Sequence, residues 1–302
     1  MSFFIEWLLN IRLGRKPYMK KKLIAPALVI VLSLLYIAFV HPAVQTITYF
    51  PIASDKHYKY AYTKLIPPVD ASFDGRFRVD WTSISMSENP FYLRQDVSLL
   101  FRNGCLIGAK SSWKRNTAAI KMTEYPAMQG DSILEAITFH HGEIHDKNDK
   151  ISSLQTMSSS RLYVDSDQKK PFTINAFNTA STEDEANFQK TMDSKTKQKL
   201  LYYWNDIAGE LKIDLNDYMT IPLASLVQYE SEPLPGMTAE QTKEITGKLW
   251  EGLYKQYVIK ILTDKNPNTC MPLILLDRKK SHLQIIYKLN GKTEQLIQKI
   301  RN

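Results

Sequence analysis

An uncharged apolar run near the N-terminus constrains this chain more than any other feature. The run is Leu23–Val40, "LIAPALVIVLSLLYIAFV". As a helix rising 1.5 Å per residue it would be roughly 27 Å long, close to the thickness of a bilayer core. Residues 1–22 hold six lysines and arginines against one glutamate. By the positive-inside rule, the sequence predicts a basic cytoplasmic segment at 1–22, a transmembrane anchor at 23–40, and everything after His41 outside.

Retention of this anchor is a separate question. A signal peptidase site needs small residues at alternate positions after the apolar run. The stretch "AFVHPAVQT" offers only Ala43, preceded two positions earlier by His41. This pattern favours a retained signal-anchor, with a cleaved and secreted form as the alternative. Translation from Met19 instead of Met1 would also give a compact basic segment before the run.

The net charge of +8 does not indicate a nucleic-acid-binding protein. Residues 1–22 contribute +5 of this charge, and residues 41–302 carry only +3, from 33 basic and 30 acidic side chains. Binding to a phosphate backbone needs a clustered basic face. The sequence therefore predicts the membrane and other envelope proteins as partners, and no nucleic acid.

The chain has two cysteines, Cys105 and Cys270, both in the predicted exterior part. Their spacing does not fit a structural zinc site. A disulfide between them and two buried free thiols are equal alternatives at this stage, because a disulfide would suit an exported domain but is not required by it.

Strand patterns follow the predicted anchor. Residues 41–75 are rich in tyrosine and proline and lack sustained periodicity, which predicts a stalk with extended pieces. From Arg76 the chain alternates apolar and polar residues, as half-buried strands do. Two apolar runs joined by Asn103–Gly104 predict a hairpin with a type I′ turn. An antiparallel sheet of four or five strands is expected over 76–165.

Helical patterns come next. Ser181 and Asp184 have capping-box spacing before one apolar stripe, and Thr238 and Gln241 open a second helix that ends near "DKNPN". Two strands around "DRKKS" follow, and 292–300 is either a third strand or a helix. The predicted fold is therefore α+β: a transmembrane helix, then an extracytoplasmic domain at 76–302 with mostly antiparallel sheet and two main helical regions.

The stretch "FHHGEIHD", Phe139–Asp146, holds three of the six histidines. If it is a strand, His141, Glu143 and His145 share one face and are candidate metal ligands. Strand geometry sets the Cα atoms of His141 and His145 roughly 13 Å apart, so one ion would need a bend and a further ligand. If the stretch were a helix, these two histidines could share an ion with a third ligand from His57, His282 or Asp146, but Gly142 and the surrounding strand patterns argue against a helix. We favour a hairpin end whose polar side chains face water. A surface whose imidazoles titrate together near neutral pH is a third interpretation.

Other catalytic patterns are sparse. Two Ser-x-x-Lys matches, Ser111 with Lys114 and Ser194 with Lys197, lack the accompanying motifs of serine enzymes. We therefore predict a non-catalytic binding or accessory protein of the cell envelope, such as a sensor, regulator or assembly factor, with no cofactor. The alternative is an exported envelope hydrolase, serine-based or metal-dependent through the His140–His145 cluster.

Overall fold

The computed structural model describes residues 47–53, 55–67, 76–146, 148, 150–166, 174–264 and 267–300. The predicted anchor at 23–40 and the basic segment at 1–22 lie outside these residues. No helix among the described residues is long and apolar enough to cross a membrane. The described part of the chain is mostly antiparallel sheet with three α-helices, which confirms the predicted α+β class at this coarse level.

The main sheet has six strands in the order β1-β3-β6-β7-β8, with β4 also paired to β3. Every pair in it is antiparallel. The strands are β1 (Tyr58–Ile66), β3 (Asp80–Arg102), β4 (Cys105–Glu124), β6 (Ser132–His145), β7 (Ile151–Ser166) and β8 (Ile174–Phe177). A separate ribbon pairs β2 (Arg76–Arg78) with β5 (Ala127–Gln129). The predicted hairpin turn is confirmed, because Asn103 and Gly104 join β3 to β4 with φ angles of 48° and 80°.

Strand β3 is long enough for its two halves to belong to two different layers of the fold. Its first half pairs with β1, its second half pairs with β6, and β4 follows it along both halves. The register shifts between Met86 and Phe91, where the chain reads "ENP". Side chains of the two halves then meet, since the Ser85 hydroxyl donates to Asp96 Oδ2 at 2.7 Å. The β3–β4 ribbon is therefore folded over itself, and its two halves face each other.

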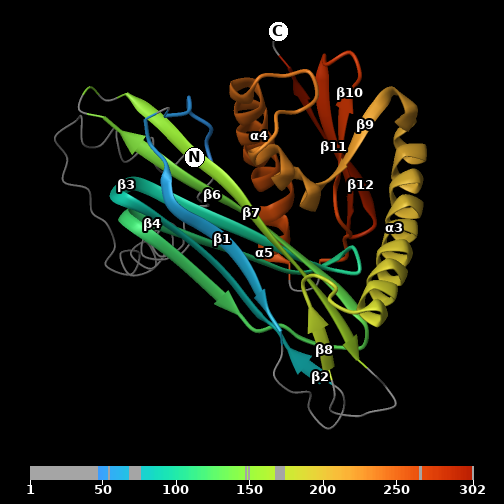
Figure 1. Cartoon of the computed structure of the whole chain (residues 1–302). Helices are drawn as coiled ribbons and strands as arrows, with labels where there is room; N and C mark the ends of the chain where they lie inside the picture. Colours follow the sequence, from blue (N-terminus) through green and yellow to red (C-terminus); the bar gives the residue numbers. More distant parts are fainter. Residues whose placement is uncertain are drawn as a thin grey trace, which may run out of the picture. The chain divides into compact units, whose positions relative to one another are not determined.

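Strand β1 lies in the range predicted as a stalk, 41–75, and belongs instead to the main sheet. Its side chains alternate at the end of the strand, with Thr63 and Leu65 buried and their neighbours Tyr62, Lys64 and Ile66 exposed. The Leu65 N–H donates to Ser160 Oγ of β7 at 3.1 Å, so β1 lies over β7 as Figure 1 shows. Strand β1 thereby covers the open side of the folded ribbon.

The second half of the chain supplies the helices and a four-stranded antiparallel sheet of order β12-β11-β10-β9. Its elements are α3 (Glu183–Leu211), β9 (Tyr218–Pro222), a 3-10 helix (Leu223–Glu230), α4 (Ala239–Leu253), a π-helical turn (Tyr254–Val258), α5 (Ile259–Thr263), β10 (Leu273–Asp277), β11 (His282–Leu289) and β12 (Lys292–Lys299). Strand β9 was not predicted. Of the two alternatives for 292–300, the strand is the one observed.

The helix starts follow from capping. Thr238 and Gln241 form the predicted capping box at the start of α4. Helix α3 begins one residue later than predicted, because Thr182 is its N-cap and accepts from the Glu185 N–H. The Glu185 carboxylate in turn accepts from the Ser181 N–H at 2.7 Å. These contacts satisfy N–H groups that a helix start leaves without partners.

Two large apolar cores result, beside a small third cluster of Ile133, Tyr163, Phe177 and Met192. The larger lies between one face of the main sheet and the elements of the second half, and Figure 1 shows α4 between the two sheets. The Phe139 ring of β6 stacks on Trp250 of α4 with centroids 5.1 Å apart. The smaller core lies inside the folded ribbon around Trp81.

A disulfide joins Cys105 to Cys270, which decides between the two alternatives left by the sequence. Cys105 begins β4 of the main sheet, and Cys270 comes just before β10 of the second sheet. Backbone hydrogen bonds flank the link, from the Leu106 N–H to Thr269 at 3.0 Å and from the Met271 N–H to Gly104 at 2.8 Å. The disulfide thus ties the two sheets together.

Candidate functional site

The histidine cluster lies on β6, as the strand interpretation predicted. His140 is fully buried and His141 is 3% exposed. The expectation that the polar side chains of this hairpin end face water is therefore wrong for these two residues. The reason is that both faces of β6 are covered, one by the folded ribbon and one by the large apolar core.

The three candidate metal ligands are divided between two environments. Glu143 and His145 contact each other, and the His145 ring stacks on Tyr92. His141 has a different partner, because its Nε2 lies 3.3 Å from Ser153 Oγ. Across the described part of the chain, no three histidine, cysteine or acidic side chains are placed to share one ion. Metal binding by these three residues stays a prediction.

His141 is electrostatically unusual. Burial lowers its pKa to about 4, although the carboxylates of Asp96 and Glu251 favour the charged form. The Phe139 ring stacks beside it at 6.1 Å. His141 is therefore neutral at physiological pH and does not belong to a group of imidazoles that titrate together near neutrality.

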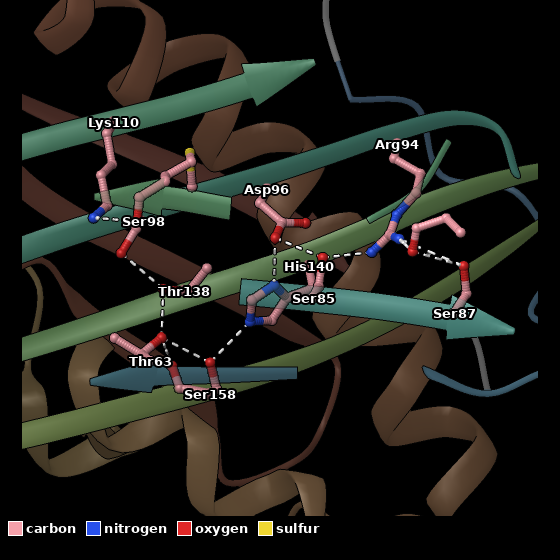
Figure 2. Close-up of polar contacts among 12 residues, drawn as sticks. Thr63, Ser85, Ser87, Arg94, Asp96, Ser98, Lys110, Thr138, His140 and Ser158 are labelled. Carbon is pink, nitrogen blue, oxygen red and sulfur yellow. Dashed lines mark hydrogen bonds and ion pairs between the residues drawn. The ribbon is translucent and has the colours of Figure 1, made fainter. Parts of the chain in front are cut away.

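The dense polar cluster of this protein surrounds His140 instead, inside the folded ribbon (Figure 2). Its hydrogen bonds form one chain that begins and ends on β3 and passes through β6, β1 and β7 in between. In order along this chain, the members are Trp81, Ser98, Thr138, Thr63, Ser158, His140, Asp96, Ser85, Arg94 and Ser87. We call this set the polar spine.

Three ionisable groups form the centre of the polar spine. Arg94, Asp96 and His140 are each fully buried. The Arg94 guanidinium donates to Ser85 Oγ, and the Ser85 hydroxyl donates to Asp96 Oδ2, so the serine bridges cation and carboxylate. The guanidinium also lies over the Tyr58 ring, 5.2 Å from its centroid. Burial raises the pKa of the Tyr58 hydroxyl, which keeps it neutral.

The Asp96–His140–Ser158 series has the order of a catalytic triad. Asp96 Oδ2 is 2.8 Å from His140 Nδ1, and His140 Nε2 is 2.8 Å from Ser158 Oγ. In a hydrolase, the imidazole accepts the serine proton and the carboxylate orients the ring. Figure 2 shows these three side chains pointing toward one another from three strands.

In this protein the hydrogen bond between His140 and Ser158 runs in the opposite direction to that of a hydrolase, with the imidazole as donor and the serine as acceptor. Each hydroxyl has one proton to donate. Thr138 donates to Ser98, and Thr63 donates to Thr138. The contact of 2.7 Å between Thr63 and Ser158 then needs the Ser158 proton. His140 Nε2 must therefore donate to Ser158, which is the reverse of nucleophile activation.

Lys110 ends the polar cluster on the β4 side. Its ammonium lies over the Trp81 ring at 4.0 Å and donates to the carbonyl oxygens of Trp81 and Met122. Burial lowers its pKa to about 8, against the opposing influence of Glu124 and Asp80. The folded ribbon thus encloses a second cation besides Arg94.

The structure does not support a catalytic role for either of the two Ser-x-x-Lys matches. Ser111 and Lys114 lie on β4, where residues three apart point to opposite faces. Ser111 accepts a hydrogen bond from Gln95 at 3.1 Å. Ser194 and Lys197 lie on exposed positions of α3.

Sequence reasoning missed the polar spine, although a signal was present. The hidden faces of its strands carry small hydroxyl residues, Ser83, Ser85 and Ser87 on β3 and Ser158 and Ser160 on β7. Solvent faces of strands usually carry long charged side chains. A face of serines and threonines allows two layers to approach closely, and that pattern could have indicated a covered face.

No protein-family model matches the chain, and no curated protein or solved structure matches it.

Proposed function

We propose that this chain is a membrane-anchored protein whose folded domain, from β1 onward, lies outside the cytoplasm and acts by binding, as an accessory, sensor, regulator or assembly factor of the cell envelope. The observation that carries the proposal is the Cys105–Cys270 disulfide. Disulfides persist in oxidising compartments and are rare in the cytosol. The apolar run at 23–40, with basic residues before it, supports the same location.

The energetic contribution of the disulfide strengthens this argument. The cysteines are 165 residues apart in sequence. Closing a loop of that length stabilises the folded state by about 5 kcal/mol in the chain-entropy model. This is a large part of the net stability of an ordinary domain, so the fold depends on a compartment that keeps the bond oxidised.

A binding role is supported by the polar spine, because its histidine and carboxylate are already hydrogen-bonded within the fold. Both ring nitrogens of His140 and one oxygen of Asp96 are engaged within the polar spine. Both residues are fully buried, so their chemistry stabilises the fold rather than meeting a substrate. Proposed partners are the membrane and other envelope proteins.

The location is tested on the full chain in intact cells. We expect added protease to digest the domain from outside, and a maleimide reagent to label Cys105 and Cys270 only after reduction. A double variant, Cys105→Ser with Cys270→Ser, is the control for the labelling. Protection of the domain until the membrane is opened, together with thiols that react at once, would contradict the proposal.

A second candidate function is an exported serine hydrolase, favoured by the Asp96–His140–Ser158 geometry alone. Its test is labelling of the full chain with a fluorophosphonate probe, beside Ser158→Ala and Ser159→Ala. Ser159 is the neighbouring exposed serine and serves as the matched control. Labelling that disappears only in Ser158→Ala would establish the hydrolase. Absence of labelling at Ser158 would leave the binding function.

A further inference from the structure

A cleft with a volume of about 400 Å³ opens beside α3. It lies where α3 crosses from the main sheet to the second sheet, so strands of both sheets contribute to its walls. The volume falls in the range of roughly 300–1,000 Å³ typical of ligand sites. Its apolar lining is Ile133, Leu200, Leu201, Trp204, Leu215, Pro222, Met271 and Leu273.

The floor of the cleft suits hydrocarbon. Leu200, Trp204 and Met271 are nearly fully buried. The Trp204 indole N–H is already bonded to the Met271 carbonyl at 2.8 Å. Among the described residues, no buried side-chain polar atom lining the cleft lacks a partner. A polar group in this floor would lose its hydrogen bonds to water without replacement, so the part of a ligand that enters must be apolar.

Charged side chains line the cleft where α3 begins to cover it. Asp193 and Lys197 precede Leu200 and Trp204 on the same helix by one to three turns. Arg161 of β7 pairs with Glu135 of β6 beside them. The charged and apolar parts of the lining are therefore separated along α3, as an amphiphilic ligand requires.

The charged side chains of the lining differ in whether they already have an ion-pair or hydrogen-bond partner within the protein. Glu135 is held by Arg161, and Asp193 accepts from the Tyr163 hydroxyl at 2.9 Å. Lys197 is exposed and forms no ion pair with any described residue. Both carboxylates thus have protein partners, and the cation of Lys197 remains to attract a ligand.

A second hollow of about 320 Å³ adjoins the first at Glu135, Arg161 and Ser225. Ser159 and Gln228 supply further polar groups to its lining. The Arg161 side chain, 49% exposed, stands between the two hollows. This arrangement leaves room for a polar head group beside an apolar cleft.

We propose that the cleft binds an amphiphile with one acyl chain and an anionic head group. The chain lies against Leu200, Trp204 and Met271, and the head group contacts Lys197 and Arg161. This inference rests on the proposed binding function and names the ligand for it. It does not depend on which side of the membrane the domain occupies.

The test is photo-crosslinking of the full chain in membranes with a palmitate analogue that carries a diazirine on its acyl chain. We expect crosslinks to map to Leu200, Leu201, Trp204 or Met271. Asn205→Trp, at an exposed position of the lining, should reduce this labelling about tenfold, equivalent to about 1.4 kcal/mol of binding free energy. Gln198→Trp, on an exposed position of α3 outside the lining, is the matched control and should leave the labelling unchanged.

Removing a lysine charge from the lining, and comparing charged with uncharged competitors, tests whether the head group is anionic. Lys197→Gln should reduce labelling about threefold, equivalent to about 0.7 kcal/mol of binding free energy, which is within the range for an exposed ion pair. Lys195→Gln is the matched control at an exposed position that does not line the cleft. Unlabelled palmitate should compete, and hexadecanol should compete less well. Equal competition by hexadecanol would overturn the anionic head group.

Two further results would overturn the site itself. One is labelling confined to 23–40 or spread over exposed apolar residues such as Ile297. The other is labelling at the cleft that Asn205→Trp leaves intact. Each variant is first checked for an oxidised Cys105–Cys270 bond, which separates loss of the site from loss of the fold. Protease accessibility and thiol labelling test the location independently, so the two proposals can fail separately.

Discussion

Phe139 and His140 are neighbours on β6, but they point to opposite faces of the main sheet, and the two faces are built differently. Phe139 enters a large apolar core and stacks on Trp250. His140 enters the folded ribbon and joins a chain of hydrogen bonds. Both residues are at most 1% exposed. The two residues are therefore equally buried, but Phe139 is held by non-directional packing and His140 by directional hydrogen bonds.

This difference predicts how each face responds to mutation. Apolar packing loses free energy in proportion to the atoms removed and the cavity left. A polar network loses more when one member is removed alone, because its former partner stays buried without a hydrogen bond. Removing both partners of one bond should cost less than the sum of the two single removals. The two faces can therefore be distinguished by matched substitutions.

The largest effect is expected for Asp96→Ala on the polar face. It leaves Arg94 without its bridged carboxylate and His140 Nδ1 without its partner. Leaving the buried cation of Arg94 without that carboxylate lowers the free energy of unfolding by about 3–5 kcal/mol. Urea unfolding at constant pH measures the loss. Glu88→Ala, at an exposed position of the same strand, is the control and should change stability by less than about 0.5 kcal/mol. A loss below about 1 kcal/mol for Asp96→Ala would mean that the carboxylate contributes little.

A somewhat smaller effect is expected for Leu99→Ala on the apolar face of the same strand. Leu99 is fully buried in the large core, across from Ile137. Truncation should cost about 3 kcal/mol, within the range for buried leucines. Leu99→Met keeps the volume and should cost less than about 1.5 kcal/mol. If the two substitutions cost the same, shape rather than volume would govern this face.

The difference between the faces also explains what the sequence could predict. The apolar run before Asn103–Gly104 identified the second half of β3, and the alternation there separates Arg94, Asp96 and Ser98 from Val97 and Leu99. The same alternation normally means that the polar set faces water. Here a second layer covers it, and only the tertiary fold decides that. Local periodicity gives the faces of a strand but not what lies against them.

Other elements show where local signals were sufficient. The Asn103–Gly104 turn and the Thr238–Gln241 capping box are decided within a few residues, and both were predicted. Strand β9 is five residues long and is held by pairing with β10, which is distant in sequence. The cluster around His140 likewise draws partners from four strands. Features that depend on long-range pairing were the ones missed.

The pH dependence of stability tests the one histidine on the apolar face. The pKa of His141 is lowered by burial to about 4, so between pH 4 and its unfolded value of 6.5 the unfolded state binds more protons. The free energy of unfolding should therefore fall as pH decreases through this window, by about 2 kcal/mol between pH 7 and pH 5. Other groups titrate there too, so the measured quantity is the difference between the native chain and His141→Gln. Parallel pH profiles for the two proteins would show that His141 contributes nothing.

The smallest effect concerns one bond of the polar spine and separates directional from non-directional stabilisation most sharply. Thr63 donates to Thr138 at 2.6 Å, and both residues are buried. Thr63→Val and Thr138→Val alone should each cost about 1 kcal/mol, because each leaves a neighbouring hydroxyl with one partner fewer. The double variant removes the bond entirely, while Ser98 keeps Trp81 and Ser158 keeps His140 as partners. Its cost should be less than the sum of the single costs by about 0.5–1 kcal/mol, which a double-mutant cycle measures by urea unfolding. Strict additivity would mean that the two hydroxyls act independently, and the polar face would then differ from the apolar face in composition but not in cooperativity.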